Sequence, residues 1–132
     1  MKKILVVDDS QSWVSYHKNF LEEIYGDEYI IETALSAKEG YDLVYNNMAT
    51  PYCLIVSDLQ MECTYEPKHA GEWFIEQVKM LKVYANTAII IISAAYNIRT
   101  IASSLNVSCL PKATAARDLN AYRLAMDELL KK

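Results

Sequence analysis

Short apolar runs recur along the chain and alternate with longer stretches whose apolar positions repeat with a helical period. The runs occupy residues 4–7, 29–31, 54–56, 88–92 and, more weakly, 107–110. Several of them are aliphatic at every position, which is typical of strands that are covered on both faces of a sheet. The pattern therefore predicts five buried strands.

The intervening stretches predict amphipathic helices. Their apolar stripes lie within residues 13–24, 41–48, 74–81, 98–105 and 119–129. Gly26 follows the first stripe as a helix-ending residue, and Ser36 and Glu39 form a capping box that opens the second helix. The third helix is expected over 73–84 and the last one after Thr114. We interpret the aromatic and methionine side chains of these stripes as helix–sheet packing.

This alternation of strand and helix predicts an α/β fold with a parallel sheet, right-handed crossovers and helices on both faces. The chain of 132 residues is close to the commonest domain size, and we find no internal repeat, low-complexity tract or linker in it. Residues 1–132 are therefore expected to form one domain. The one long polar break between elements is residues 62–70, ECTYEPKHA.

Composition narrows the function classes. The net charge of −4 argues against nucleic-acid binding by bulk electrostatics. The apolar runs are too short for a signal peptide or a membrane span. Cys53, Cys63 and Cys109 form no C-x-x-C pair, which favours buried apolar cysteines in a reducing compartment. We expect a cytoplasmic protein that binds neither nucleic acid nor membrane, and we expect His17 to be a surface histidine.

Acidic residues follow two of the predicted strands. Asp8 and Asp9 come directly after the first strand, and Asp58 ends the third. Ligands of a doubly wound sheet bind at the carboxyl ends of its strands, so the three carboxylates would share one crevice if these strands are neighbours. Two carboxylates about 4 Å apart repel by roughly 4 kcal/mol at an effective dielectric constant of about 20, so a cation is needed to offset them. Oxygen ligands with room for water suit Mg²⁺.

A hydroxyl and an ammonium group are expected at the same edge of the sheet. Ser93 ends the fourth strand, and Lys112 follows the fifth. With a divalent ion they would offer partners for the oxygens of a phosphoryl group, and an aspartate among them would be the nucleophile. Taken singly, Asp8 and Asp9 could form a helix N-cap, and the other residues could be caps or surface groups. Their joint placement favours a site for phosphoryl transfer onto an aspartate.

The segments ILVVDDS, LIVSDLQM and IIISAA, followed by a late lysine, resemble the receiver domain of two-component response regulators over the whole chain. The resemblance implies a flavodoxin-like, doubly wound, five-stranded parallel sheet of order 2-1-3-4-5. It implies that Asp58 is the phospho-acceptor, that Ser93 is the switch hydroxyl and that Lys112 pairs with a phosphoryl oxygen. It also implies an Mg²⁺ site formed by Asp8 through a water, by Asp9 and Asp58, and by the backbone carbonyl of Gln60.

The sequence departs from the pattern of that family at several points. The tract 62–70 lengthens the loop after the acceptor, either as a tolerated surface insertion or as a loop that contacts a partner. Pro111 precedes Lys112, where the family has the lysine first and a cis bond between them, so the loop is expected to take another path. Cys109 stands where a switch aromatic is expected, and Tyr96 is a nearby substitute. The segment between Ser93 and Lys112 is also shorter than is usual in that family.

The function implied by the resemblance is that of a stand-alone receiver. A sensor histidine kinase or phosphotransfer protein would phosphorylate Asp58 in the presence of Mg²⁺, and the change would alter the affinity for a separate effector protein. Beyond its own phosphorylation and slow dephosphorylation it would not be an enzyme. The alternative is a protein-binding module that kept the fold without a working switch. A nucleotide-binding enzyme is disfavoured, because the chain has three glycines and neither phosphate-binding glycine motif.

Overall fold

Five parallel strands form a sheet in the order β2-β1-β3-β4-β5. The computed structural model describes residues 1–61 and 69–132. The strands are β1 (Lys2–Val7), β2 (Tyr29–Ala34), β3 (Leu54–Ser57), β4 (Ala88–Ser93) and β5 (Ser108–Pro111). The chain passes from β1 outward to β2 and then crosses back to β3, so β1 and β3 are neighbours. The predicted flavodoxin-like sheet is confirmed.

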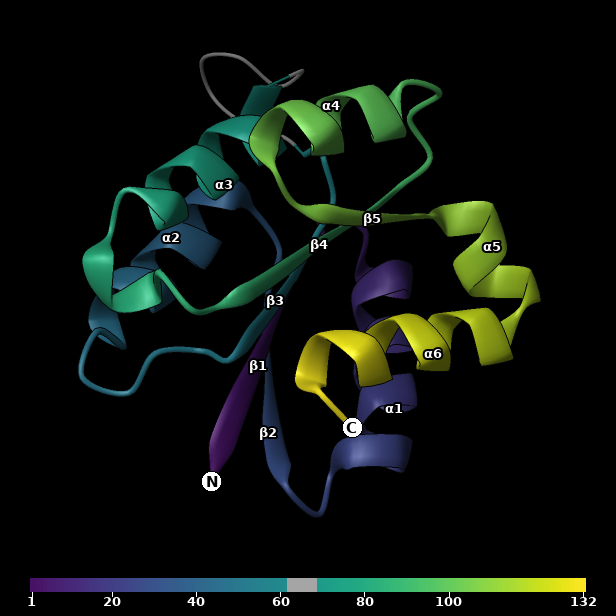
Figure 1. Ribbon diagram of the computed structural model, residues 1–132, viewed down its shortest axis with the longest axis horizontal. Helices are drawn as coiled ribbons and strands as arrows, with labels where there is room; N and C mark the ends of the chain where they lie inside the picture. The colour runs from purple at the N-terminus through teal and green to yellow at the C-terminus, as the bar shows by residue number, and fades with distance from the viewer. Residues whose placement is uncertain (62–68) are drawn as a thin grey trace.

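Helices cover both faces of the sheet (Figure 1). One face carries α2 (Ala37–Asn46), α3 (Ala70–Lys79) and α4 (Ile98–Leu105), and a 3₁₀ turn, η2 (Lys82–Tyr84), precedes β4. The other face carries α1 (Gln11–Tyr25), α5 (Lys112–Arg117) and α6 (Leu119–Leu130). Each face therefore has its own hydrophobic core.

The unbroken aliphatic run of β1 follows from this arrangement. Leu5 and Val7 point into the core under α2 and α3, whereas Ile4 and Val6 point into the core under α1 and α6. All four side chains are fully buried. A strand between two helical layers has no solvent face, so alternation with polar residues is lost.

The predicted start of α2 is also confirmed. The hydroxyl of Ser36 accepts a hydrogen bond from the Glu39 N–H at 3.1 Å. The Glu39 carboxylate accepts from the Leu35 N–H at 3.3 Å, so the second arm of the capping box reaches one residue beyond the cap. Gly26 ends α1 as expected, but in the right-handed conformation that any residue can adopt.

Two helix predictions need correction. The third helix begins at Ala70 and ends at Lys79, and only η2 remains of its predicted last turn. The last helix is split at Asp118, which ends α5 and caps α6 by accepting from the Ala121 N–H at 3.0 Å. The split arises because an aspartate side chain can replace a backbone acceptor and open a new helix.

The buried stripe of α1 differs from the predicted one. Its buried residues are Val14, His17, Leu21 and Tyr25, whereas Ile24 is exposed. The expectation of a surface histidine was therefore wrong, since His17 is only 1% exposed. On α2, Tyr45 likewise points to solvent although its stripe was predicted to be buried.

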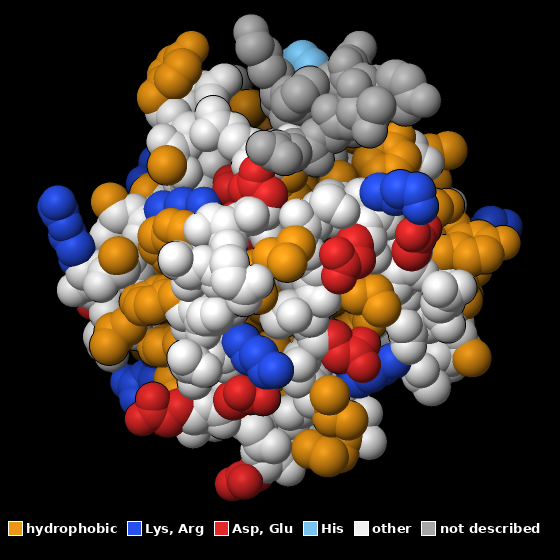
Figure 2. All heavy atoms as spheres, turned by 180° about the vertical axis from the view of Figure 1, so that it is seen from behind, with side chains coloured by type: hydrophobic (Ala, Val, Ile, Leu, Met, Phe, Trp, Pro, Cys, Tyr) orange, Lys and Arg blue, Asp and Glu red, His pale blue; other side chains and the backbone are white. Residues whose placement is uncertain are grey.

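The surface and the cysteines complete this description. Acidic and basic side chains of the described residues lie interspersed on the face seen in Figure 2. Cys53 and Cys109 are half-buried, unpaired and packed beside the two cores, and Cys63 lies outside the described residues. Within the described ranges, each helix is too short or too polar to cross a membrane.

Candidate functional site

Three carboxylates meet at the carboxyl ends of two adjacent strands. Asp8 and Asp9 follow β1, Asp58 follows β3, and the pairing of Val7 with Ser57 brings the two strand ends level. One oxygen from each of the three carboxylates lies within 4.8 Å of the other two. Asp8 and Asp58 are buried and Asp9 is exposed. The predicted convergence of the three acids is therefore present in the structure.

Lys112 bridges two of these acids. Its Nζ lies 2.9 Å from Oδ2 of Asp58 and 3.0 Å from Oδ2 of Asp8. Lys112 is the first residue of α5, directly after Pro111, and the described residues contain no cis peptide bond. The reversed order of proline and lysine thus leads into a helix, and the ammonium group still reaches the acids.

Backbone N–H groups hold the two buried carboxylates in place. Oδ1 of Asp8 accepts from the Ser10 N–H at 2.9 Å, and Oδ1 of Asp58 accepts from the Leu59 N–H at 2.7 Å. The N-cap of α1 is Ser10, whose hydroxyl accepts from the Trp13 N–H. The N-cap position of α1 is therefore held by Ser10 and by neither aspartate, and an oxygen of each aspartate lies near Asp58 in the crevice.

Burial and charge oppose one another at this site. Burial raises the pKa of the Asp8 carboxyl, the Ser10 N–H opposes that shift, and the nearby charge of Asp58 adds to it. Burial alone would lower the pKa of Lys112, but its hydrogen bond and attraction to Asp58, and then to Asp8, raise it overall. Lys112 is thus held as a cation between two acids.

The described residues fit a hard divalent cation. The donors are carboxylate oxygens, the ligand type that Mg²⁺ prefers. Oδ2 of Asp8 is buried, and its neighbour among the described residues is the Lys112 ammonium at 3.0 Å. Lys112 offsets the charge of Asp8 and Asp58, and a divalent cation held by oxygens of all three acids would add to that offset.

Ser93 and Gln60 occupy the positions expected of them, but their roles stay predictions. Ser93 is the last residue of β4 and is buried, and its hydroxyl accepts from the Ala95 N–H at 3.2 Å. Gln60 follows Asp58 by two residues, and its N–H lies 3.4 Å from Oδ1 of Asp58. Gln60 thus lies next to the acidic crevice, and Ser93 ends the strand that pairs with β3.

The structure shows where Cys109, Tyr96 and part of the tract 62–70 lie, which are positions that depart from the receiver pattern. Cys109 lies on β5 and packs half-buried against the core under α4, so no ring occupies that position. Tyr96 is 98% exposed and therefore does not fill it. Of the tract 62–70, residues 62–68 lie outside the described residues, His69 is the N-cap of α3, and Ala70 is its first residue.

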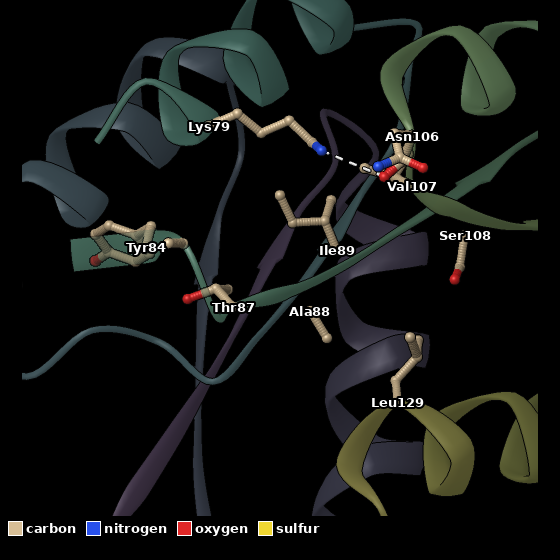
Figure 3. Close-up of a pocket in the computed structure, with 10 residues that line it drawn as sticks. Lys79, Tyr84, Thr87, Ala88, Ile89, Asn106, Val107, Ser108 and Leu129 are labelled. Atoms are coloured by element: carbon tan, nitrogen blue, oxygen red, sulfur yellow. Dashed lines mark hydrogen bonds between the residues drawn. The ribbon is translucent and has the colours of Figure 1, made fainter. Parts of the chain in front are cut away.

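Figure 3 shows a hollow that is lined by Lys79, Thr87 and Asn106, among others. It borders Ala88 and Ser108, the first residues of β4 and β5, whereas the acids follow the last residues of their strands. Lys79 crosses it to donate to the carbonyl of Asn106 at 3.2 Å. This hollow is therefore separate from the acidic crevice.

A ring system next to Lys112 was not predicted from the sequence. Nζ of Lys112 lies 5.0 Å from the centroid of the Trp13 ring on α1. Trp13 packs on His17, whose Nδ1 lies 2.6 Å from the hydroxyl of Tyr122 on α6. The spacing of Trp13 and His17, four residues apart, was the available signal, because such residues share one side of a helix.

Burial of His17 predicts a pH-dependent stability. Burial, assisted by the charge of Lys112, lowers the pKa of His17 from 6.5 to about 4. Between these two pH values the unfolded chain binds a proton that the folded protein does not, so stability is lost as the pH falls. The expected loss from this group is about 3 kcal/mol of unfolding free energy between pH 7.5 and 4.

Denaturant unfolding at a series of pH values would measure this loss. Tyr16, Tyr122 and Lys112 also face His17, and the acids titrate as well, so wild type must be compared with His17→Gln. The difference between the two proteins should shrink as the pH falls. His69→Gln, which alters an exposed histidine far from His17 in the sequence, is the matched control. Parallel profiles for wild type and His17→Gln would contradict the prediction.

Comparison with known proteins supports the fold. No protein-family model matches the sequence, and neither does any curated protein. The signal receiver domain of a DNA-binding response regulator from Colwellia psychrerythraea 34H superposes with a TM-score of 0.79 at 17% identity, covering 100% of both chains. A response regulator receiver domain from Clostridium thermocellum gives 0.74 at 24% identity, covering 99% of this chain and 95% of its own.

The chemotaxis protein CheY4 of Vibrio cholerae gives a TM-score of 0.67 at 23% identity, over 92% of this chain and 98% of its own. These similarities extend along nearly the full length of the chain and of the compared domains. The protein therefore has the fold of response regulator receiver domains.

Proposed function

We propose that this protein is a phosphorylation switch in two-component signalling and that Asp58 is its phospho-acceptor. The observation that carries the proposal is the position of Lys112, whose ammonium contacts Asp58 and Asp8 at once. Here two buried acids and an exposed third share the crevice with it, which suits a centre that manages the charge of a phosphoryl group.

The chain's own residues would act in distinct ways. The Leu59 N–H holds Oδ1 of Asp58, which leaves Oδ2 to attack the phosphorus atom of a donor. An O–P bond forms as the donor's N–P bond breaks, and the electron pair stays on the donor's imidazole nitrogen. Lys112 then pairs with a phosphoryl oxygen, and Ser93 approaches another.

Asp8, Asp9, Asp58 and the Gln60 carbonyl would hold Mg²⁺. When bound, this ion neutralises charge on the phosphoryl oxygens.

The proposed phosphodonors are a sensor histidine kinase or a phosphotransfer protein, and the proposed readout is binding to a separate effector protein. The protein would act on itself and not on a metabolite. The unpaired cysteines favour a reducing compartment, so the proposed location is the cytoplasm.

The proposal is tested with a small phosphodonor. Incubation of the wild-type protein with acetyl phosphate and Mg²⁺ is expected to add the mass of one phosphoryl group, read by intact-mass spectrometry. A chelator added before the donor should prevent the adduct, because the three carboxylates would then lack their cation. Failure of the wild-type protein to gain the adduct at any Mg²⁺ concentration would count against the proposal.

A second candidate function is a protein-binding module without a working switch. It is favoured by the missing ring at Cys109 and by the full exposure of Tyr96. A stable phosphoryl mimic distinguishes the two functions by NMR. Backbone shifts that stay unchanged on α4 and β5 and elsewhere would favour the passive module, whereas a concerted change would favour the switch.

A further inference from the structure

Lys112 has a third partner besides its two acids. Its Nζ lies over the ring of Trp13 at 5.0 Å from the centroid, and its side chain is only 12% exposed. The negative face of an indole attracts a cation, and more strongly when water is excluded. Trp13 sits in the first turn of α1, which Ser10 caps directly after the two acids. The indole therefore limits where the ammonium group can go.

The ring of Trp13 is itself fixed by an aromatic cluster, defined here as Trp13, Tyr16, His17, Phe20 and Tyr122. Trp13 contacts Tyr16 edge-on and His17 in a tilted arrangement, both at 5.3 Å between centroids. Phe20 packs against Tyr122 at 4.1 Å. Trp13, Tyr16 and Phe20 are half-buried and pack against the core under α1 and α6, so a shift of the Trp13 ring changes its contacts with Tyr16 and His17.

One hydrogen bond connects this cluster to α5, which carries Lys112, and a second lies within the cluster and joins α1 to α6. The hydroxyl of Tyr16 donates to the carbonyl of Ala115 on α5 at 2.6 Å. Nδ1 of His17 lies 2.6 Å from the hydroxyl of Tyr122 on α6, and both side chains are buried. The rings thus join α1 to α5 and to α6, on the face of the sheet opposite to α4.

We propose that Trp13 is a positioning residue for Lys112 and that the aromatic cluster carries the state of Asp58 to the interface of α1 with α5 and α6. This inference rests on the proposed function. Lys112 cannot keep its contacts of 2.9 and 3.0 Å to both acids once a phosphoryl group on Asp58 stands between them. The ammonium group must then move away from its present place over the indole. Loss of that contact lets the Trp13 ring shift, and Tyr16 and His17, which contact the ring, shift with it.

Fluorescence of Trp13 tests the second part of the proposal. The chain has two tryptophans, and the other, Trp73, is 43% exposed on α3. Trp73→Phe leaves Trp13 as the only indole, and Trp13→Phe leaves only Trp73. Each variant is equilibrated with Mg²⁺, acetyl phosphate is added, and emission and intact mass are followed in one sample.

Emission of the Trp73→Phe protein is expected to change with the time course of the adduct, and emission of the Trp13→Phe protein to stay constant. An adduct that forms while Trp13 emission stays constant would overturn the inference and leave the proposed function intact. Absence of any adduct in both variants and in wild type would instead overturn the proposed function, on which the inference depends.

The positioning role is tested by the rate of phosphorylation. Trp13→Leu keeps apolar bulk but removes the ring, and the initial rate of adduct formation is expected to fall about 3- to 10-fold. Trp13→Phe keeps a weaker ring face and should restore part of that rate. Trp73→Leu, the matched control at an exposed indole, should leave the rate unchanged. Equal rates for Trp13→Leu, Trp13→Phe and wild type would overturn the positioning role.

A purely structural role is distinguished by measuring unfolding free energies for the same variants. If the rates follow stability across Trp13→Leu, Trp13→Phe and Trp73→Leu, the ring acts only through folding and the inference fails. If Trp13→Phe is faster than Trp13→Leu at matched stability, the ring face itself positions the ammonium group.

Discussion

Substitution of Asp58 by asparagine is expected to abolish the phosphoryl adduct completely. The amide oxygen of asparagine can still accept from the Leu59 N–H, so the loop after β3 should keep its conformation. The amide nitrogen, however, is a poor nucleophile, and it replaces the oxygen that lies 2.9 Å from Nζ of Lys112. Intact-mass spectrometry after incubation with acetyl phosphate and Mg²⁺ measures the loss.

Asp42→Asn is the matched control for this substitution. Asp42 lies exposed on α2, where it pairs with Lys38, and removal of its charge leaves the crevice untouched. This variant should gain the same adduct as wild type. Persistence of the adduct in Asp58→Asn, with circular dichroism showing a folded protein, would mean that another residue is the acceptor. The proposal that Asp58 is the phospho-acceptor would then be wrong.

The fold and the meeting of the acids could be predicted because both follow from strand order. Residues at the carboxyl ends of parallel strands share one edge of the sheet, so the placement of Asp8 and Asp58 needed only the adjacency of β1 and β3. Full burial of Ile4 and Val6 on one face and of Leu5 and Val7 on the other explains why the aliphatic runs gave a clear signal.

Which residues of a helix face the sheet could not be predicted in the same way. Trp13 and Val14 are adjacent and both apolar, so periodicity alone does not tell which one faces the sheet. His17 can be buried because its ring forms a hydrogen bond with Tyr122, a residue more than a hundred positions away along the chain. The helix break at Asp118 depends likewise on a local side-chain bond that competes with the helical pattern.

Replacing Gly71 with alanine is expected to lower the free energy of unfolding by about 3 kcal/mol or more, and to slow phosphorylation. A Cβ at Gly71 would lie 2.3 Å from the carbonyl oxygen of Asp58 and 2.5 Å from Cα of Leu59. Both contacts are with backbone atoms, which cannot turn aside as a flexible side chain can. Either α3 or the loop that presents Asp58 must move.

Gly40→Ala is the matched control, because this glycine also lies in a helix against the same core. Its added Cβ would meet side-chain atoms, Val7 Cγ2 at 2.9 Å and a Phe74 ring carbon at 3.2 Å. Small rotamer shifts can relieve these contacts, and alanine gains up to about 1 kcal/mol of helix propensity over glycine. Its net cost should therefore be well below that of Gly71→Ala.

Urea unfolding and the rate of adduct formation should be measured on both glycine variants. The Gly71 N–H donates to the Leu59 carbonyl at 3.1 Å, so the start of α3 and residues 58–59 form one unit. Displacement of that unit would also disturb the contact of Asp58 with Lys112. Equal stabilities for Gly71→Ala and Gly40→Ala would show that α3 can shift without cost, and that its close approach does not hold the acceptor in place.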